Sequence, residues 1–347
     1  MPISIFVSDL SITSALPLAL TMGEPAGVGG ELALAAWKRR AAGVPPFFLI
    51  DEPERLCRLS EMLGLEVPVV AIAEPQETVG VWEAGLPVLP QYLNVPVVPG
   101  HPDPANAPAV ITAIERAVGF VQRGEAAAIV TSPIQKQSLH AVGFEYPGHT
   151  EFLAALAGPG TIPVMMLASP LLRVVPVTIH CSLKDAVSSL TQDKIVETGR
   201  IVAQSLARDF GLVKPRLALA GINPHAGEAG AFGYEDIEVI APAVAELQAL
   251  GIDARGPLPA DTMFHPAARA RYDVAICMYH DQALIPIKTL DFDGGVNVTL
   301  GLPFIRTSPD HGTALDLAGS GMARPDSLIA ALCLAGTMAT HRRQLGS

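Results

Sequence analysis

The fold of this chain is indicated first by the stretch Val274-Ala-Ile-Cys-Met-Tyr279-His280-Asp281-Gln282, an apolar run that turns polar at a histidine. Two other apolar runs, 173–179 and 217–222, end in the same way, at His180 and at His225. Such runs are typical of buried strands in an α/β sheet, where ligands bind beyond the carboxyl ends of the strands. A single histidine after a strand is more often an ordinary loop residue. Three of them with polar neighbours favour convergence on one metal ion.

Length and composition exclude several classes of protein. A chain of 347 residues is longer than one hydrophobic core usually supports, so two lobes are expected. Half of the residues are hydrophobic and only 16% are charged, which excludes intrinsic disorder. Because the formal net charge is −11, we expect no binding to nucleic acid or to an anionic membrane surface. An acidic substrate would have to be held by a few local cations.

Cysteine usage and the N-terminus predict a soluble, cytoplasmic protein. The four cysteines form no Cys-x-x-Cys pair, so neither a disulfide framework nor a thiolate metal site is expected. Residues 1–15 lack a basic segment before their apolar residues, which argues against a secretory signal. No apolar stretch approaches the length of about 18 residues that a membrane span requires.

Short apolar runs alternate with amphipathic stretches along the chain, which is typical of an α/β protein with a largely parallel sheet. The predicted strands are 18–21, 47–50, 126–130, 164–168, 173–178, 217–222 and 274–278. The predicted helices are 30–41, 53–63, 109–123, 150–157, 192–210, 237–250 and 325–339. The proline-dense stretch 87–108 is interpreted as an ordered surface connection between lobes, because proline cannot donate to a β-ladder.

A glycine-rich turn, Gly23-Glu-Pro-Ala-Gly27-Val-Gly29-Gly30, follows the first predicted strand and opens a helix. It is not a dinucleotide-binding fingerprint, because Leu32 stands where the third glycine of that motif belongs. We interpret the segment as a tight turn that lines a cleft, and whether it touches a ligand stays open.

Three hydrogen-bond donors, Lys288, Asn297 and Arg306, follow His280 in the sequence. An ammonium, an amide and a guanidinium together suit a phosphate dianion. Taken singly, each of these side chains is more often an exposed, solvated residue than part of a binding site. The argument for a phosphate site is therefore their position after the predicted metal-binding segment in a chain that has few cations.

The segment Thr307-Ser-Pro-Asp310-His311-Gly312-Thr313-Ala-Leu-Asp316 fits an ordinary helix N-cap. It also resembles the adenosine-binding loop of isocitrate and isopropylmalate dehydrogenases, which are metal-dependent enzymes that oxidise a hydroxy acid with a nicotinamide cofactor. That resemblance implies cofactor binding by four residues: His311, Gly312, Thr313 and Asp316.

Between Pro17 and Ala339 the chain resembles the family of 4-hydroxythreonine-4-phosphate dehydrogenases, which act in pyridoxal phosphate biosynthesis. The motifs that carry the resemblance are Gly23-Glu-Pro-Ala-Gly27, Pro147-Gly-His149-Thr150-Glu151, Asn223-Pro-His225-Ala-Gly-Glu228, Gly256-Pro-Leu-Pro-Ala-Asp261, Tyr279-His280-Asp281-Gln282 and the segment 307–319. Glu24, usually aspartate, and Gly30, often proline, depart from the family pattern. The resemblance implies a two-lobed α/β/α isopropylmalate dehydrogenase-like fold with the active site in the interdomain cleft. Residues 16–145 and 305–347 would form the cofactor-side lobe, and 146–304 the metal-binding, dimer-forming lobe.

The same resemblance implies roles for individual residues. A divalent metal would be held by His180, His225 and His280, two from one chain and the third ligand donated across a homodimer interface. The substrate would be bound by His149, Thr150, Lys288, Asn297 and Arg306. The candidates for catalytic groups are Asp261, Asp281 and Lys288. The two aspartates could equally be the partners that orient metal-binding histidines.

The implied reaction is oxidation of 4-phosphooxy-L-threonine at C3 by NAD or NADP, followed by decarboxylation of the β-keto acid to 3-amino-2-oxopropyl phosphate. Three imidazoles favour zinc or cobalt as the metal, and magnesium is conceivable if substrate oxygens complete the shell. No single basic residue in the sequence distinguishes NAD from NADP.

Three alternatives stay open. A related dehydrogenase acting on a phosphorylated four-carbon sugar acid, or on a dihydrodiol dicarboxylate, would use the same positions. A three-histidine metallohydrolase that activates water belongs to another class and would have no use for the loop 310–316. A non-catalytic phosphate-binding module would show affinity without turnover.

Overall fold

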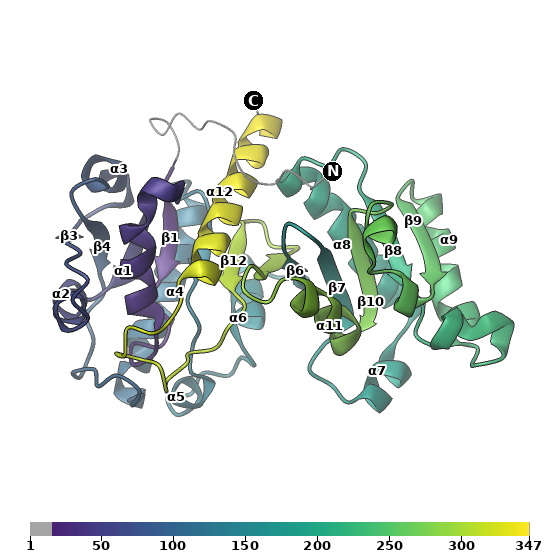
Figure 1. Cartoon of the computed structure of the whole chain (residues 1–347), viewed down its shortest axis with the longest axis horizontal. Coiled ribbons are helices and arrows are strands. Elements are labelled where there is room, and N and C mark those ends of the chain that lie inside the picture. The colour runs from purple at the N-terminus through teal and green to yellow at the C-terminus, as the bar shows by residue number, and fades with distance from the viewer. Residues whose placement is uncertain (1–15, 347) are drawn as a thin grey trace. The chain divides into compact units, whose positions relative to one another are not determined.

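The computed structural model describes residues 16–346, which form two compact units (Figure 1). The first unit comprises 16–163 and 302–340, and the second comprises 164–301 and 341–346. Helix α6 (His149–Ala157) packs into the core of the first unit, where Phe152 and Leu153 are buried. Residues 1–15, for which the sequence argues against a secretory signal, lie outside the described residues.

The first unit contains a parallel sheet of six strands in the order β3-β4-β2-β1-β5-β12. These strands are β1 (Leu18–Thr21), β2 (Phe47–Asp51), β3 (Val69–Ala71), β4 (Leu86–Pro90), β5 (Ile129–Thr131) and β12 (Arg306–Pro309). Its other helices are α1 (Gly29–Lys38), α2 (Pro53–Met62), α3 (Thr78–Val81), α4 (Ala107–Gln122), α5 (Lys136–His140) and most of α12 (Asp326–Gly346), with the short turns η2 (Arg40–Ala42), η3 (Pro75–Glu77) and η4 (Pro104–Asn106). Its central strands β1 and β2 are buried along their whole length and mostly apolar, because helices cover both faces of a parallel sheet.

The second unit contains strands in the order β11-β6-β7-β10-β8-β9. They are β6 (Val164–Ala168), β7 (Arg173–Thr178), β8 (Arg216–Ala220), β9 (Asp253–Leu258), β10 (Val274–Tyr279) and β11 (Val296–Leu300). Strand β6 runs antiparallel to β7 and β11, and the other pairs are parallel. The helices are α7 (Leu183–Ser189), α8 (Gln192–Phe210), α9 (Ala241–Ala249), α10 (Pro266–Arg269) and α11 (His280–Leu290), with the turns η5 (Pro224–Gly230), η6 (Asp236–Ile240) and η7 (Ala260–Thr262).

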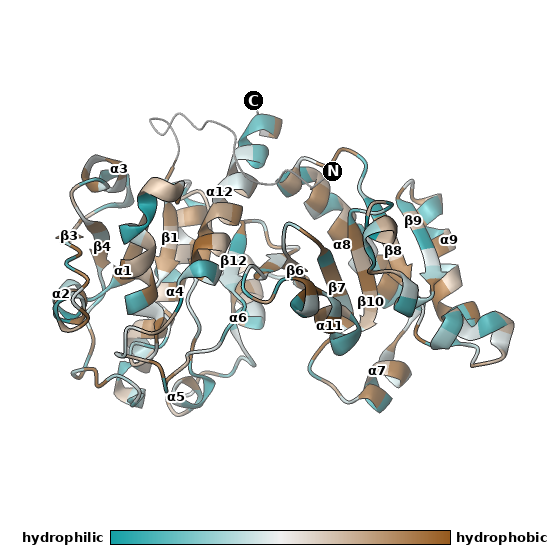
Figure 2. Ribbon diagram, viewed as in Figure 1, coloured by the Kyte–Doolittle hydropathy of each residue, from teal (hydrophilic) through white to brown (hydrophobic). Residues whose placement is uncertain are grey.

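The predicted α/β class is confirmed, as are the seven predicted strands within a few residues at their ends. Hydropathy explains this success, since predicted strands such as β1 and β10 carry the hydrophobic colour in Figure 2, whereas β9, which was not predicted, is largely hydrophilic. Five strands escaped prediction, namely β3, β4, β9, β11 and β12. Helix α11 was also missed, because Pro286 interrupts its sequence pattern.

The interpretation of 87–108 as a surface connection between lobes is wrong for its first residues. Strand β4 is buried and lies between β3 and β2, and the whole stretch belongs to the first unit. Pro87 is tolerated because it precedes Val88, the first residue of β4 that pairs with β2. The ladder to β3 uses its neighbours, with Leu86 donating to Pro68 at 2.8 Å and Val88 accepting from Ile72 at 2.9 Å.

All four cysteines are free thiols. Across residues 16–346, no helix combines the length and the apolar character needed to cross a bilayer.

Candidate functional site

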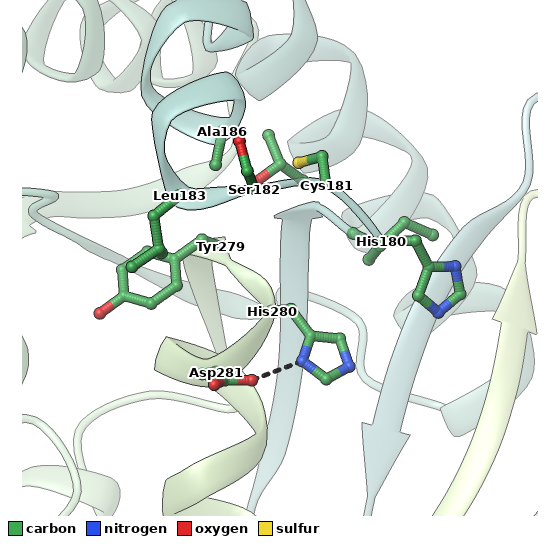
Figure 3. Close-up of a pocket in the computed structure, with 10 residues that line it drawn as sticks. His180, Cys181, Ser182, Leu183, Ala186, Tyr279, His280 and Asp281 are labelled. Carbon is green, nitrogen blue, oxygen red and sulfur yellow. Dashed lines mark hydrogen bonds and ion pairs between the residues drawn. The ribbon is translucent and has the colours of Figure 1, made fainter.

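Two of the predicted metal ligands, His180 and His280, lie side by side. They follow the neighbouring parallel strands β7 and β10, whose last residues Thr178 and Tyr279 are paired in register. Their ring centroids are 6.1 Å apart, and both line a cavity of about 440 Å³ (Figure 3). The convergence predicted from strand ends is therefore present for this pair.

The rings of this pair lie about 1 Å farther apart than two imidazoles that share a metal ion. Two imidazoles on one tetrahedral zinc have ring centroids about 5 Å apart, given Zn–N distances of about 2 Å. Asp281 lies 2.7 Å from Nδ1 of His280, an arrangement that leaves Nε2 for a ligand. In Figure 3, Asp281 and His180 lie on opposite sides of the His280 ring. The structure thus favours the orienting role for Asp281 over the role of proton acceptor.

The third histidine, His225, does not join this pair within one chain. It lies in η5, where its Nδ1 is 3.2 Å from a Glu228 carboxylate oxygen and its ring meets Phe232 edge-on at 5.8 Å. Among residues 16–346, no three histidine, cysteine or acidic side chains gather closely enough to hold a metal. Donation of a ligand from a second copy of the chain therefore stays a prediction.

The contact between Asp281 and His280 leads to a first test. Replacing Asp281 with alanine should weaken zinc or cobalt binding by about 10- to 100-fold, because partners that orient a ligating imidazole have effects of that size. Replacing it with asparagine keeps an acceptor and should cost less. Metal titration of the metal-free protein measures both variants. If Asp281→Asn instead binds metal normally and loses turnover, the carboxylate is a proton acceptor.

A second group of side chains, the basic cluster of Lys136, His149 and Arg306, lies in the first unit. Arg306 begins β12, is 4% exposed, and donates to Thr131 Oγ1 from Nε at 3.1 Å and from Nη2 at 2.7 Å. Burial lowers the pKa of its guanidinium to about 10, so it remains charged at neutral pH. A Cβ added at Gly148 would lie 3.6 Å from Lys136 Nζ, which places this ammonium beside the start of α6.

His149 presents an unused polar atom in this cluster. Its Nε2 is enclosed and has no hydrogen-bond partner. Burial, reinforced by the charges of Arg306 and Lys136, holds the pKa of His149 well below its ordinary value of 6.5. His149 and Thr150 also occupy the first turn of α6, where free backbone N–H groups and the helix dipole favour an anion. The cluster is therefore suited to bind a phosphate.

The pKa of His149 predicts how stability depends on pH. The folded state keeps the ring neutral, whereas the unfolded state takes up a proton below pH 6.5, so stability falls as the pH drops below that value. Between pH 7.5 and 5.5 the loss should be about 1.4 kcal/mol more for the unaltered protein than for His149→Gln. Urea unfolding at pH 7.5 and 5.5 measures the difference. Equal acid losses in both proteins would contradict it.

Lys136 and Thr131 were missed in the sequence, although a signal for them existed. Thr131 is the last residue of the apolar strand β5, and Lys136 begins α5 five residues later. The same strand-end argument that singled out the histidines applies to them. The signal is weaker at this strand because β5 has only three residues and Pro133 follows it closely.

The remaining predicted substrate and catalytic residues lie in the second unit. Lys288 lies two turns after Asp281 on the same face of α11, with its ammonium 5.7 Å from the centre of the Phe292 ring. Asn297 lies in β11, opposite Leu167 of β6. Asp261 is exposed in η7, which packs against η5, so it lies near the His225 segment and does not line the cavity at His180.

The predicted cofactor loop packs against the glycine-rich turn. Val28 donates to the carbonyl of Thr313 at 3.1 Å, and a Cβ at Gly27 would lie 2.7 Å from that same oxygen, so only glycine fits there. His311 Nδ1 lies 2.9 Å from the Gly312 carbonyl, while its enclosed Nε2 has no partner in the protein. Gly312 and Asp316 are exposed. An enclosed, unpaired ring nitrogen beside exposed backbone fits a loop that receives a polar ligand such as adenosine.

Comparison with known proteins relates this chain to a protein family. A family model described as pyridoxal phosphate biosynthetic protein PdxA matches residues 46–335. The chain is 59% identical over 330 residues to a 4-hydroxythreonine-4-phosphate dehydrogenase of Methylorubrum populi, covering 93% of this chain and 94% of that protein.

Solved structures agree with this assignment. A 4-hydroxythreonine-4-phosphate dehydrogenase from Klebsiella pneumoniae superposes with a TM-score of 0.85 at 37% identity, covering 94% of this chain and 100% of that one. A terephthalate 1,2-cis-dihydrodiol dehydrogenase from Burkholderia xenovorans gives a TM-score of 0.64 at 27% identity, with 93% and 98% covered. The family model and the high identity along nearly the whole length show that this chain belongs to the PdxA family of pyridoxal phosphate biosynthetic proteins.

Proposed function

We propose that the protein is a metal-dependent NAD(P) dehydrogenase that oxidises 4-hydroxythreonine 4-phosphate, also called 4-phosphooxy-L-threonine, at C3. The β-keto acid formed then loses carbon dioxide to give 3-amino-2-oxopropyl phosphate. The observation that carries the metal dependence is the His180–His280 pair with Asp281 at the ends of adjacent strands. The substrate is inferred from the names of the relatives in this family.

The basic cluster and its neighbours would bind the phosphate. Arg306 offers a charged, planar donor set, and the first turn of α6 offers backbone N–H groups together with Thr150. The neutral His149 ring is suited to donate or accept one hydrogen bond through Nε2 without adding charge. Lys288 and Asn297 would supply further donors to the substrate.

The metal would be held by His180 and His280 of one chain and by His225, which we assign to a second copy in a homodimer. A bound divalent cation, zinc, cobalt or magnesium, would lower the pKa of a hydroxyl and act as a Lewis acid toward a ketone. Asp281 would hold the His280 ring in place, which leaves Lys288, on the same face of α11, as the candidate for proton transfer. Asp261 is a weaker candidate.

NAD or NADP would bind at the loop that contains His311, Gly312, Thr313 and Asp316. The support for this role is the packing of that loop on the glycine-rich turn and the unpaired Nε2 of His311. Thr313 contributes its backbone carbonyl to this packing and is itself partly exposed.

The proposal is tested by following nicotinamide reduction at 340 nm. Metal-free protein is incubated with zinc, cobalt or magnesium, with NAD or NADP, and with one of three substrates: 4-phosphooxy-L-threonine, 4-phosphothreonate or 4-phosphoerythronate. We expect metal-dependent turnover that is fastest with 4-phosphooxy-L-threonine and removed by a chelator. Faster turnover of a sugar acid would reassign the substrate. Hydrolysis of phosphate esters without nicotinamide reduction would make the protein a metallohydrolase, and binding without either reaction a phosphate-binding module.

A further inference from the structure

A buried carboxylate, Asp236, supports the turn that carries His225. Asp236 begins η6 and is 0% exposed. Its Oδ1 accepts from the backbone N–H of Ile222 at 2.9 Å, and its Oδ2 accepts from the backbone N–H of Asn223 at 3.2 Å and from Asn223 Nδ2 at 2.9 Å. Three donors from the segment just before His225 thus converge on one side chain.

The supported turn has an unusual backbone. His225, Ala226, Glu228 and Ala229 all have φ between 41° and 56°, and Gly227 between them has φ 79°. Left-handed conformation is disfavoured for every residue with a Cβ, and such residues normally occur singly. A run of this kind persists only where the surrounding structure imposes it, and it is a common feature of functional sites.

Packing ties the turn to Asp236 at two points. A Cβ at Gly221, before the turn, would lie 2.6 Å from Asp236 Oδ1, and one at Gly227, within it, would lie 3.3 Å from Oδ2. Asp236 therefore contacts the chain on both sides of His225. The imidazole itself is oriented by other groups, Glu228 at 3.2 Å from Nδ1 and Phe232 against the ring.

We propose that Asp236 is a positioning residue for metal binding: by holding residues 221–227 in the left-handed turn, it fixes where His225 presents Nε2. This inference rests on the proposed role of His225 as a metal ligand. Asp236 itself touches neither metal nor substrate. It holds the turn in the geometry that binding requires before the metal arrives. The free-energy cost of ordering the turn is then not part of the binding step.

The test compares Asp236→Asn with a matched buried aspartate of the same unit, Asp209, which is 2% exposed and pairs with Arg342. Asparagine has nearly the same shape but faces at least one of the three donors with its own N–H₂ group. Full-length, metal-free protein is titrated with Co²⁺ and its visible absorption is followed, and its melting temperature is measured without metal.

We expect Asp236→Asn to weaken Co²⁺ binding by about 10- to 100-fold, the range found for groups that orient metal ligands. Turnover should recover toward its normal rate at high Co²⁺. Asp209→Asn should lower the melting temperature and leave Co²⁺ affinity unchanged. If both variants change affinity in proportion to their loss of melting temperature, Asp236 has only a structural role and the proposal is overturned.

Two further variants separate this inference from the proposed function. His225→Ala should lose tight Co²⁺ binding; if it does not, His225 is no ligand, and both the metal assignment and the role of Asp236 fail. If His225→Ala loses binding while Asp236→Asn keeps it, only the positioning role fails. Asn223→Ala, which removes one of the three donors, should weaken binding in the same direction by less than about 10-fold, and it provides the test should Asp236→Asn not fold. Unchanged binding by Asn223→Ala would then overturn the proposal.

Discussion

Replacing His280 with alanine is expected to lower kcat/KM for 4-phosphooxy-L-threonine by at least about 10³-fold. The change removes one of two imidazoles whose rings lie 6.1 Å apart and leaves Asp281 without its partner. Losing a group that only orients a ligand costs about 10- to 100-fold, so losing the ligand itself should cost more. A bound metal also contributes several kcal/mol of charge stabilisation to the reaction.

The measurement for His280→Ala combines steady-state kinetics with the metal content of the dialysed protein. His265→Ala provides the matched control, because His265 is an exposed histidine of the same unit that does not line the cavity. It should retain both activity and metal. A His280→Ala protein that keeps full metal content and full activity would remove the basis for placing the metal at the ends of β7 and β10.

Replacing Arg306 with methionine is expected to lower kcat/KM for the phosphorylated substrate by about 10- to 100-fold. Arg306 is a buried cation beside His149 and Lys136, and a hydrogen bond to a charged group contributes about 1.5–3 kcal/mol. The kcat/KM of Arg306→Lys should lie between that of Arg306→Met and that of the unaltered protein, because lysine keeps the charge and loses the planar set of donors.

The Arg306 variants have two controls, a substrate without the phosphate and a variant of an exposed arginine. With 4-hydroxythreonine, which lacks the phosphate, Arg306→Met and the unaltered protein should differ little. Arg324→Met alters an exposed arginine of the same unit, paired with Asp326, and should change neither reaction. An equal loss on both substrates would mean that Arg306 stabilises the fold through Thr131 and does not bind phosphate.

Strands could be predicted from the sequence where a single short run of residues is mostly apolar. Strands β1, β6 and β10 are almost entirely apolar, and burial on both faces of a sheet requires that composition. Strand β9 contains Asp253, Arg255 and Gly256, and β12 begins with Arg306, so neither resembles a core strand. They form strands because neighbouring strands are available to pair with them, which is a property of the tertiary structure.

The amino-acid sequence was sufficient to place His180 and His280 at strand ends, because hydrophobic patterning and turn chemistry act over a few residues. It could not show that β7 lies next to β10, that Arg306 meets Thr131 from 175 positions away, or that Asp236 accepts from Ile222 and Asn223. These contacts join residues distant along the chain, and only the closure of the intervening segments brings them together. Local pattern thus accounts for the elements, and long-range packing accounts for the arrangement of the site.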